Sequence, residues 1–262
     1  MKKATDHRPM WTGLGLDLDK HDALLGVLGQ LYSDVYLSQK KRPDSMGYFD
    51  FVMSEVHGLR IQELVAAQEE GRVVVGSFCV FVPEELVLAV GGVNVGLCAG
   101  ADFGTEQAER FLPRNTCALI KSFFGFGLEK VCPYLESCDL VVGENTCDGK
   151  KKAFETFEHM TKGEFMALDM PNTKSGEGRA VLARAYRDLI AALERVSGKA
   201  ITVESLKAGI ETVNDKRAAM HRLARLRHAN PAPISGLDAL LANQVYFYDD
   251  PVRFTGRVEK LC

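Results

Sequence analysis

The sequence has no apolar run that approaches the roughly 20 residues a membrane-spanning helix needs, although 46% of its 262 residues are hydrophobic. Its formal net charge is only −3, so no strong basic field favours nucleic acid as a partner. The N-terminal segment MKKATDHRPMW has two lysines but no apolar stretch behind them, which argues against a secretory signal. We therefore expect a cytoplasmic protein with neither a membrane nor a nucleic-acid partner.

Nucleotide-binding fingerprints are also missing from the chain. No glycine-rich P-loop is present, so we do not expect the chain to hydrolyse nucleotides. The segment GLGLDL near the N-terminus lacks the preceding strand and the third glycine of a dinucleotide fingerprint.

Cysteine, by contrast, is concentrated in one part of the sequence. Six of the seven cysteines lie between positions 79 and 147. Disulfides explain them poorly in a chain without a secretory signal. Some can be core residues, since cysteine packs well as a small hydrophobe, but their number favours metal or cluster binding. The seven are Cys79, Cys98, Cys117, Cys132, Cys138, Cys147 and Cys262.

The spacing of the cysteines excludes some metal sites. Zinc ribbons and fingers need close pairs with two to four intervening residues, and the chain has none. The C-x₂-C-x₂-C run of a bacterial ferredoxin is missing too. Single cysteines on separate loops can still hold an iron–sulfur cluster, because thiolates are its usual ligands. We expect no histidine ligand, since His57 and His159 fall in predicted helices as exposed residues.

Four short segments read as strands of a parallel sheet. β-branched runs such as RVVVGSF are typical of strands that are buried on both faces. Their alternation with helical patterns favours an α/β fold whose parallel sheet is flanked by helices. The expected strands are Arg72–Phe78, Val93–Leu97, Asp139–Gly143 and Phe165–Asp169.

Helices are expected at both ends of the chain, where apolar residues recur at helical spacing. We therefore expect an N-terminal helical arm (1–70), a first α/β domain that carries the cysteines (71–171) and the helical start of a second α/β domain (172–262). The expected helices at the two ends are Asp19–Lys41, Phe49–Glu70, Arg179–Val196, Thr202–Arg227, Leu237–Gln244 and Pro251–Leu261.

The predicted sheet brings several cysteines to one edge. Ligands of open parallel sheets gather at the carboxyl ends of the strands. Cys79 and Cys98 directly follow the first and second strands, and Cys147 follows the third after a short turn. Cys117 is expected at a helix start, where backbone N–H groups and the helix dipole favour a thiolate. Cys132 and Cys138 precede the third strand, so we expect them nearer the opposite edge.

The block TCDGKKK combines a thiol with three lysines, Lys150 to Lys152, at a predicted helix start. A lysine run is usually a solvated turn. Cations at a helix N-terminus oppose the helix dipole, however, so a local function is worth considering. The lysines would lie beside an anionic cluster, contact substrate phosphates, or contact an acidic redox partner.

With these motifs, the chain resembles the 2-hydroxyacyl-CoA dehydratase/benzoyl-CoA reductase family, which includes the D-component of 2-hydroxyglutaryl-CoA dehydratase. Within this family it is most similar to the double-cubane cluster proteins. The resemblance runs from Gly71 to the C-terminus, with TCDGKKK as its most specific part. It rests on GSFCVFVPEELVLAVGG, LCAGADFG, LPRNTCALIKSFFGF, CPYLESCDLVVGENTCDGKKKAFE and ALDMPNTKS.

The resemblance implies the iron–sulfur component of a low-potential reductase or dehydratase. Family members hold a [4Fe-4S] or a double-cubane [8Fe-9S] cluster and receive electrons from a separate ATP-dependent iron–sulfur activator. They pass the electrons to an acyl-CoA thioester or to a small molecule. We accordingly expect a homo- or heterodimer that works with such an activator.

The resemblance also implies roles for individual residues. Cys79 and Cys117 match cysteines that bind a cluster in both branches of the family. Cys132 and Cys147 match cysteines that are characteristic of the double-cubane branch. Cys98 is a weaker candidate, as is Cys138. The acidic pair that follows the family's proline is matched by Glu84 and Glu85, and its implied role is helix capping or support of the ligands.

Family members are longer than this chain, which ends before the sheet of their second domain. We therefore expect a truncated chain, and the alternative function is a cluster-free remnant that acts as a binding or assembly module. A truncated chain should leave some apolar helix faces uncovered. The expected faces contain Leu182, Leu189, Leu193, Leu206, Ile210, Leu223 and Leu226.

Overall fold

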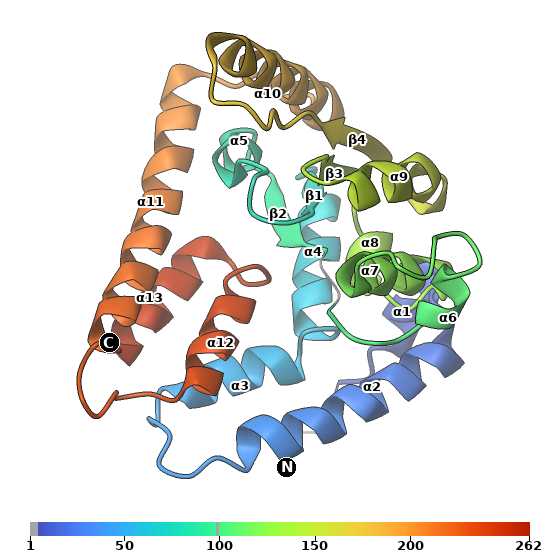
Figure 1. The fold of residues 1–262 in the computed structure, drawn as a ribbon. Helices are drawn as coiled ribbons and strands as arrows, with labels where there is room; N and C mark the ends of the chain where they lie inside the picture. The colour runs from blue at the N-terminus through green and yellow to red at the C-terminus, as the bar shows by residue number, and fades with distance from the viewer. Residues whose placement is uncertain (1–4, 98–99) are drawn as a thin grey trace.

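The computed structural model describes residues 5–97 and 100–262 (Figure 1). Its centre is a parallel sheet of four strands in the order β2-β1-β3-β4, which confirms the predicted α/β class. Each strand overlaps a segment expected from the sequence. The strands are β1 (Val74–Ser77), β2 (Val93–Gly96), β3 (Leu140–Glu144) and β4 (Glu164–Leu168).

The register of the sheet brings the strand ends together at one edge. Ser77, the last residue of β1, pairs with Gly96 of β2 and with Val142 of β3. Glu144 at the end of β3 pairs with Leu168 at the end of β4. The loops that leave the carboxyl ends of the strands therefore begin side by side.

Helices cover both faces of the sheet, which explains why every residue of β1 and β3 is buried. One face packs against an aromatic cluster that includes Phe78, Phe123 and Phe157. The other packs against leucines of the long helix that follows β4, among them Leu189 and Leu193. The covering helices are α4 (Leu59–Glu69), α7 (Ala118–Leu128), α9 (Asp148–Phe157), α5 (Glu84–Ala89) and α10 (Gly176–Ser197).

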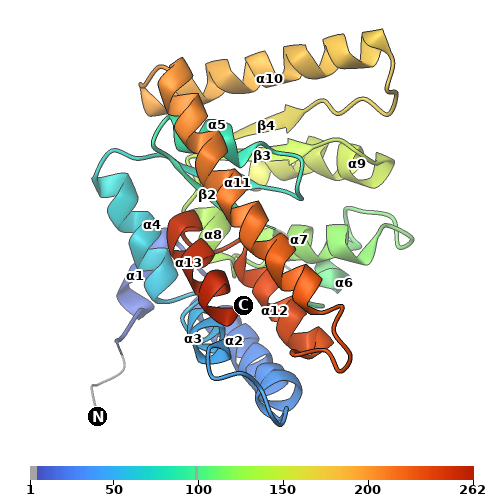
Figure 2. The ribbon, with the colours of Figure 1, turned by 90° about the vertical axis from the view of Figure 1, so that its left-hand side faces the viewer.

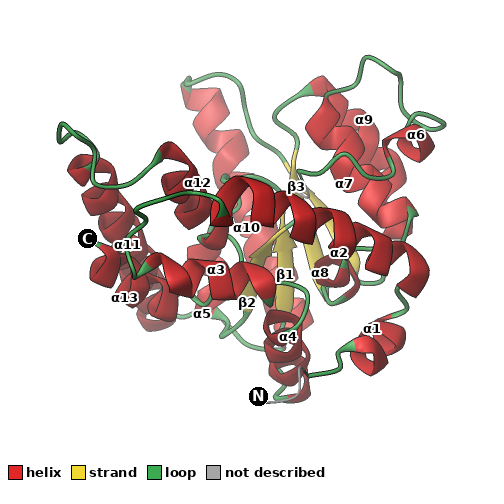
Figure 3. Cartoon of the chain, turned by 90° about the horizontal axis from the view of Figure 1, so that it is seen from below, coloured by secondary structure: helices red, strands yellow, loops and turns green. Residues whose placement is uncertain are grey.

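The last three helices pack on the N-terminal arm and on α5 rather than on a second sheet. Met46 and Phe49 of the arm contact a core that includes Leu223 and Phe254. Figure 2 shows α11 descending from α10 past α5, and Figure 3 shows α11, α12 and α13 on the side of the sheet away from α7 and α9. The elements are α3 (Met46–Ser54), α11 (Val203–Leu226), α12 (Gly236–Val245) and α13 (Pro251–Leu261).

The N-terminal arm is divided more finely than the sequence periodicity predicts. The helix expected from Asp19 to Lys41 ends at Tyr32 and continues as a π-helix over Ser33–Leu37. The helix expected from Phe49 to Glu70 is two helices, α3 and α4, that are separated by a turn at residues 55–58. The remaining helices are α1 (Arg8–Leu14), α2 (Leu18–Tyr32), α6 (Thr105–Ala108), α8 (Pro133–Glu136) and a 3-10 turn (Glu158–Met160).

The apolar faces of the late helices are only partly uncovered. Leu189, Leu193 and Leu223 are buried, whereas Ile210 and Leu226 remain about 40% exposed. The domain boundaries at residues 70 and 171 stay predictions. No helix in the described ranges has both the length and the apolar character needed to cross a membrane.

The prediction that His57 is an exposed helical residue is wrong. It lies in the turn between α3 and α4, and its Nδ1 is 3.0 Å from Nε2 of the fully buried His21. The two rings are stacked, and the indole of Trp11 donates a hydrogen bond to the His57 carbonyl. Packing of α1 and α2 over this turn buries His57, and periodicity along one segment does not reveal such a contact. His159 is exposed, as predicted.

The buried histidine pair predicts that stability falls as the pH is lowered. Burial lowers the pKa of both His21 and His57, and the charge of His21 lowers that of His57 further. The unfolded chain takes up protons on both residues near pH 6.5, whereas the folded chain does so only at lower pH. The stability that the neutral pair contributes above pH 6.5 is therefore lost below it, at about 1.4 kcal/mol per pH unit for each histidine.

Urea unfolding between pH 7.5 and pH 5 measures this dependence. We expect a His21→Gln variant to lose less stability than the wild type over this interval, since one of the two groups no longer titrates. His159→Gln is the control and should keep the wild-type dependence. Equal slopes for wild type and His21→Gln would show that the pair does not titrate with unfolding.

Candidate functional site

Cys79 leaves the carboxyl end of β1 in a strained conformation. Its φ is +56°, which few residues with a side chain adopt. The residue before it, Phe78, is fully buried against Phe123 and Phe154, and its N–H donates to the Val142 carbonyl at 3.0 Å. The packing and hydrogen bond of Phe78 thus fix the turn, and Cys79 lies half-buried at the edge of the sheet. Such strain often marks a functional position.

Cys117 and Cys147 each occupy the N-cap of a helix, α7 and α9 respectively. Both are exposed. The first turns of these helices lie against each other, because a Cβ on Gly149 would come within 2.8 Å of Ile120 and 4.0 Å of Thr116. The two cysteines therefore begin neighbouring helices, whose free N–H groups and positive dipole ends suit an anionic ligand.

Lys150, in the first turn of α9, connects these loops to Cys79. It is only 7% exposed and forms an ion pair with Glu144 at the end of β3, and the Cys79 thiol lies near enough to raise its pKa. Burial alone would lower the pKa of Lys150, but its interactions with Glu144 and Cys79 outweigh burial and raise it. Lys151 and Lys152 are exposed instead. The lysine run therefore places one cation against a thiol and two in solvent.

Cys132 and Cys138 are not brought to this edge. Cys132 is the N-cap of α8, which follows the C-terminal end of α7. Cys117 lies at the N-terminal end of α7, and the eleven residues of that helix span about 16 Å. Burial raises the pKa of the Cys132 thiol to about 11. Cys138 is buried before β3, donates to the Tyr134 carbonyl at 3.0 Å, and also has a pKa raised by burial.

The remaining cysteines are Cys98 and Cys262. Cys98 lies outside the described residues. Cys262 is exposed at the end of α13, beside Arg222 and Glu259 rather than beside the strand ends.

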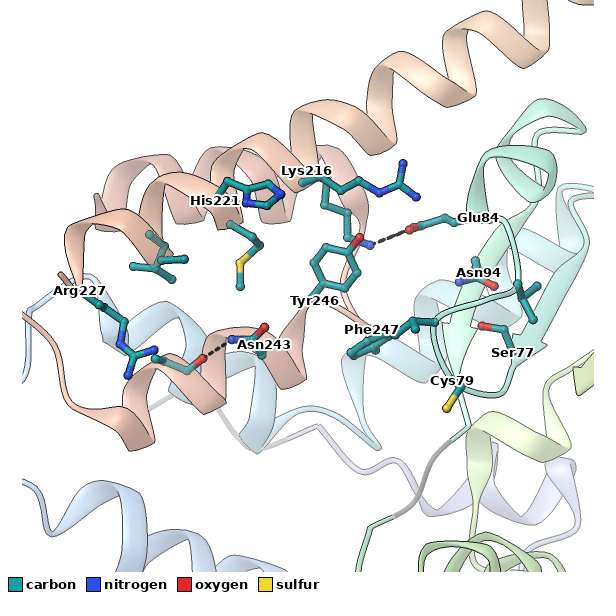
Figure 4. A pocket seen from close by; sticks show the side chains of 17 residues that line it. Ser77, Cys79, Glu84, Asn94, Lys216, His221, Arg227, Asn243, Tyr246 and Phe247 are labelled. Carbon is teal, nitrogen blue, oxygen red and sulfur yellow. Dashed lines mark hydrogen bonds and ion pairs between the residues drawn. The ribbon is translucent and has the colours of Figure 1, made fainter. Parts of the chain in front are cut away.

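A cleft opens beside Cys79, between the edge of the sheet and the helices α11 and α12 (Figure 4). Its volume is about 420 Å³, and Ser77, Cys79 and Asn94 line it from the sheet. A neighbouring hollow of about 330 Å³ shares Ser77, Cys79, Asn243 and Phe247 with it. Both hollows therefore open onto Cys79.

Glu84, from the acidic pair of α5, lines this cleft. Glu84 accepts hydrogen bonds from Lys216 at 2.9 and 3.0 Å, and the Lys216 ammonium lies 3.8 Å from the centre of the Tyr246 ring. Burial lowers the pKa of Lys216, and Glu84 opposes that effect. Glu85 pairs with Arg217 at 2.7 Å. No side-chain hydrogen bond caps the N-terminus of α5. Glu84 and Glu85 instead join α5 to α11 through their ion pairs with Lys216 and Arg217.

The wall of the cleft on α11 is cationic. Arg217, His221 and Arg227 line it. Figure 4 shows His221 and Arg227 across the cleft from Ser77 and Cys79. Guanidinium groups favour carboxylates and phosphates. The arrangement therefore suits an anionic ligand held next to a thiol.

The chain matches the family model of 2-hydroxyglutaryl-CoA dehydratase, D-component, over residues 79–262. It belongs to this dehydratase family. The match begins at Cys79 and contains Cys117, Cys147 and the cationic wall of the cleft. The family resemblance seen in the sequence is thereby confirmed.

Curated relatives of the dehydratase family match the chain over part of their length. One is the Escherichia coli protein YjiM, provisionally named a dehydratase subunit, which is 40% identical over 174 residues, 66% of this chain and 45% of YjiM. Another is the (R)-phenyllactyl-CoA dehydratase beta subunit of Clostridium sporogenes, 27% identical over 74% of this chain and 51% of that protein. A benzoyl-CoA reductase subunit of Thauera aromatica is 25% identical over 66% and 45%. The chain spans about half the length of these relatives.

The chemical groups at the sheet edge are of the type that binds an iron–sulfur cluster. Three thiols, two helix N-termini and a buried ammonium suit an anionic group bound by sulfur. In residues 5–97 and 100–262, no three His, Cys, Asp or Glu side chains are grouped closely enough to hold one metal ion. In a cubane each thiolate binds its own iron, so the ligands of a cluster do not have to converge on a single ion.

Two charged residues of the site were missed by the sequence analysis. Glu144 ends a strand whose other residues are apolar or glycine, and one of its oxygens is buried with no hydrogen-bond partner in the described part of the chain. Lys216 lies within the buried stripe of α11, between Val213 and Ala219. In both cases, a single charged residue within an otherwise apolar pattern is the sequence feature that could have indicated a buried ion pair.

Proposed function

We propose that this chain is the iron–sulfur component of a reductase or dehydratase, with a cluster held by Cys79, Cys117 and Cys147. The observation that carries the proposal is the common edge that these thiols share, where Lys150, paired with Glu144, lies beside Cys79. Cys132 is left out of the ligand set because it lies at the other end of α7. A bound cluster, either [4Fe-4S] or double-cubane [8Fe-9S], would supply single low-potential electrons.

The proposed substrate is an acyl-CoA thioester, which carries the phosphates that Arg217, His221 and Arg227 are suited to bind. The names of two relatives, a phenyllactyl-CoA dehydratase and a benzoyl-CoA reductase, support this class. A small reducible molecule is the alternative substrate. In either case the cleft places the ligand beside Cys79.

The proposed partners are an ATP-dependent iron–sulfur activator and a second subunit. The chain has no glycine-rich P-loop with which to hydrolyse ATP itself. The three relatives described above are all named as subunits, which supports assembly with another chain.

A second candidate function is a cluster-free binding or assembly module. The observation that favours it is that, in the described ranges, no three ligating side chains share a metal-sized site. Anaerobic purification followed by iron and acid-labile sulfide analysis separates the two functions. A cluster component retains about four irons and four sulfides for a single cubane, whereas a folded chain that holds neither iron nor sulfide supports the cluster-free module.

A further inference from the structure

We propose that Lys150, held by Glu144, sets the reduction potential of the cluster by placing a fixed cation against the Cys79 ligand. This inference rests on the proposed function. Nothing in the family match assigns the residue a role, and Lys150 acts through Cys79 as a positioning and charge-compensating group.

The position of Lys150 argues for a specific role. A lysine is rarely buried unless it is paired, and this one is 7% exposed. It extends from the first turn of α9 to the ends of two neighbouring strands, where it is paired with Glu144 and lies next to Cys79. Its location near a helix N-terminus is unfavourable for a cation. The arrangement places the Lys150 ammonium next to the Cys79 thiol.

Glu144 fixes the ammonium in place. Its side chain is fully buried, and one of its oxygens accepts from Lys150. The carboxylate is carried by the last residue of β3, which is paired in register with β4. The sheet therefore determines where the cation sits, and a flexible lysine becomes part of a rigid site.

The effect on a cluster follows from charge. Reduction adds an electron to a group whose thiolate ligands are already negative, so a nearby cation stabilises the reduced form more than the oxidised form. Charge and hydrogen bonds at the sulfurs are among the main determinants of iron–sulfur potentials. Because Lys150 is buried, solvent screens this interaction less than it screens an exposed lysine.

The test is a redox titration of the anaerobically reconstituted protein, followed by the EPR signal of the reduced cluster. We expect Lys150→Met to shift the midpoint potential to more negative values. Lys150→Arg keeps the charge and should retain most of the wild-type potential. Lys151→Met is the matched control, since Lys151 belongs to the same lysine run but is exposed, and its potential should equal that of the wild type.

A double variant keeps the test decisive if Lys150→Met fails to fold with Glu144 left unpaired. Lys150→Met with Glu144→Gln leaves no buried charge alone, and it too should show a more negative potential than the wild type. An unchanged potential in a folded Lys150→Met or double variant overturns the inference, as does an equal shift in Lys151→Met. Absence of iron and sulfide from the wild type would instead refute the proposed function itself.

Discussion

Replacing Lys216 with methionine is expected to lower the free energy of unfolding by about 3–5 kcal/mol, the usual cost of removing one partner of a buried ion pair. Lys216 is 2% exposed, and its ammonium contacts both carboxylate oxygens of Glu84. Methionine replaces most of the apolar volume but leaves the Glu84 carboxylate buried without its cation. Urea unfolding followed by circular dichroism measures the loss.

Arg217, one residue further along α11, provides the matched control. Its side chain is about half exposed and pairs with Glu85, and exposed pairs contribute only about 0–1 kcal/mol. Glu84→Leu combined with Lys216→Met should recover most of the loss, because neither charge is then buried alone. The account is contradicted if Lys216→Met costs no more stability than Arg217→Met.

Cys79→Ser is expected to lose most of the iron and sulfide that the wild type retains after reconstitution. A serine hydroxyl is a much poorer ligand for iron in a cluster than a thiolate. The variant should nevertheless fold, because Cys79 is only half-buried and Phe78 before it remains packed. The same loss is expected for Cys117→Ser and for Cys147→Ser.

Two other cysteines serve as controls for this loss. Cys262→Ser changes an exposed residue at the end of α13 and should leave the iron content unchanged. Cys132→Ser should also retain iron, because that thiol lies at the far end of α7. If Cys132→Ser loses as much iron as Cys79→Ser, the ligand set includes Cys132 and the assignment from the sheet edge is wrong.

The sheet and the positions of its cysteines could be predicted because the relevant signals are local. β1 and β3 are buried on both faces, so they appear in the sequence as short β-branched runs. Residues that directly follow such strands fall at the carboxyl edge of a parallel sheet by geometry alone. This rule predicts the positions of Cys79 and Cys147. The helix expected around Cys117 begins one residue after it, at Ala118.

The rest of the site depends on contacts between distant segments, which periodicity does not report. Lys216 meets Glu84 across 132 residues of chain, and His57 is buried by α1 and α2. The lysine run gave no indication of which lysine points inward. That choice depends on how the start of α9 packs, where the missing side chain of Gly149 lets this turn approach Ile120 of α7.

The central claim is that the thiols at the sheet edge hold an iron–sulfur cluster, and low-temperature EPR tests it most directly. The anaerobically reconstituted wild-type chain, reduced with dithionite, should give the signal of a paramagnetic iron–sulfur cluster. Cys79→Ser prepared in the same way should give none, while Cys262→Ser should match the wild type. A wild-type chain that is folded by circular dichroism but gives no cluster signal in either the oxidised or the reduced state would contradict the account.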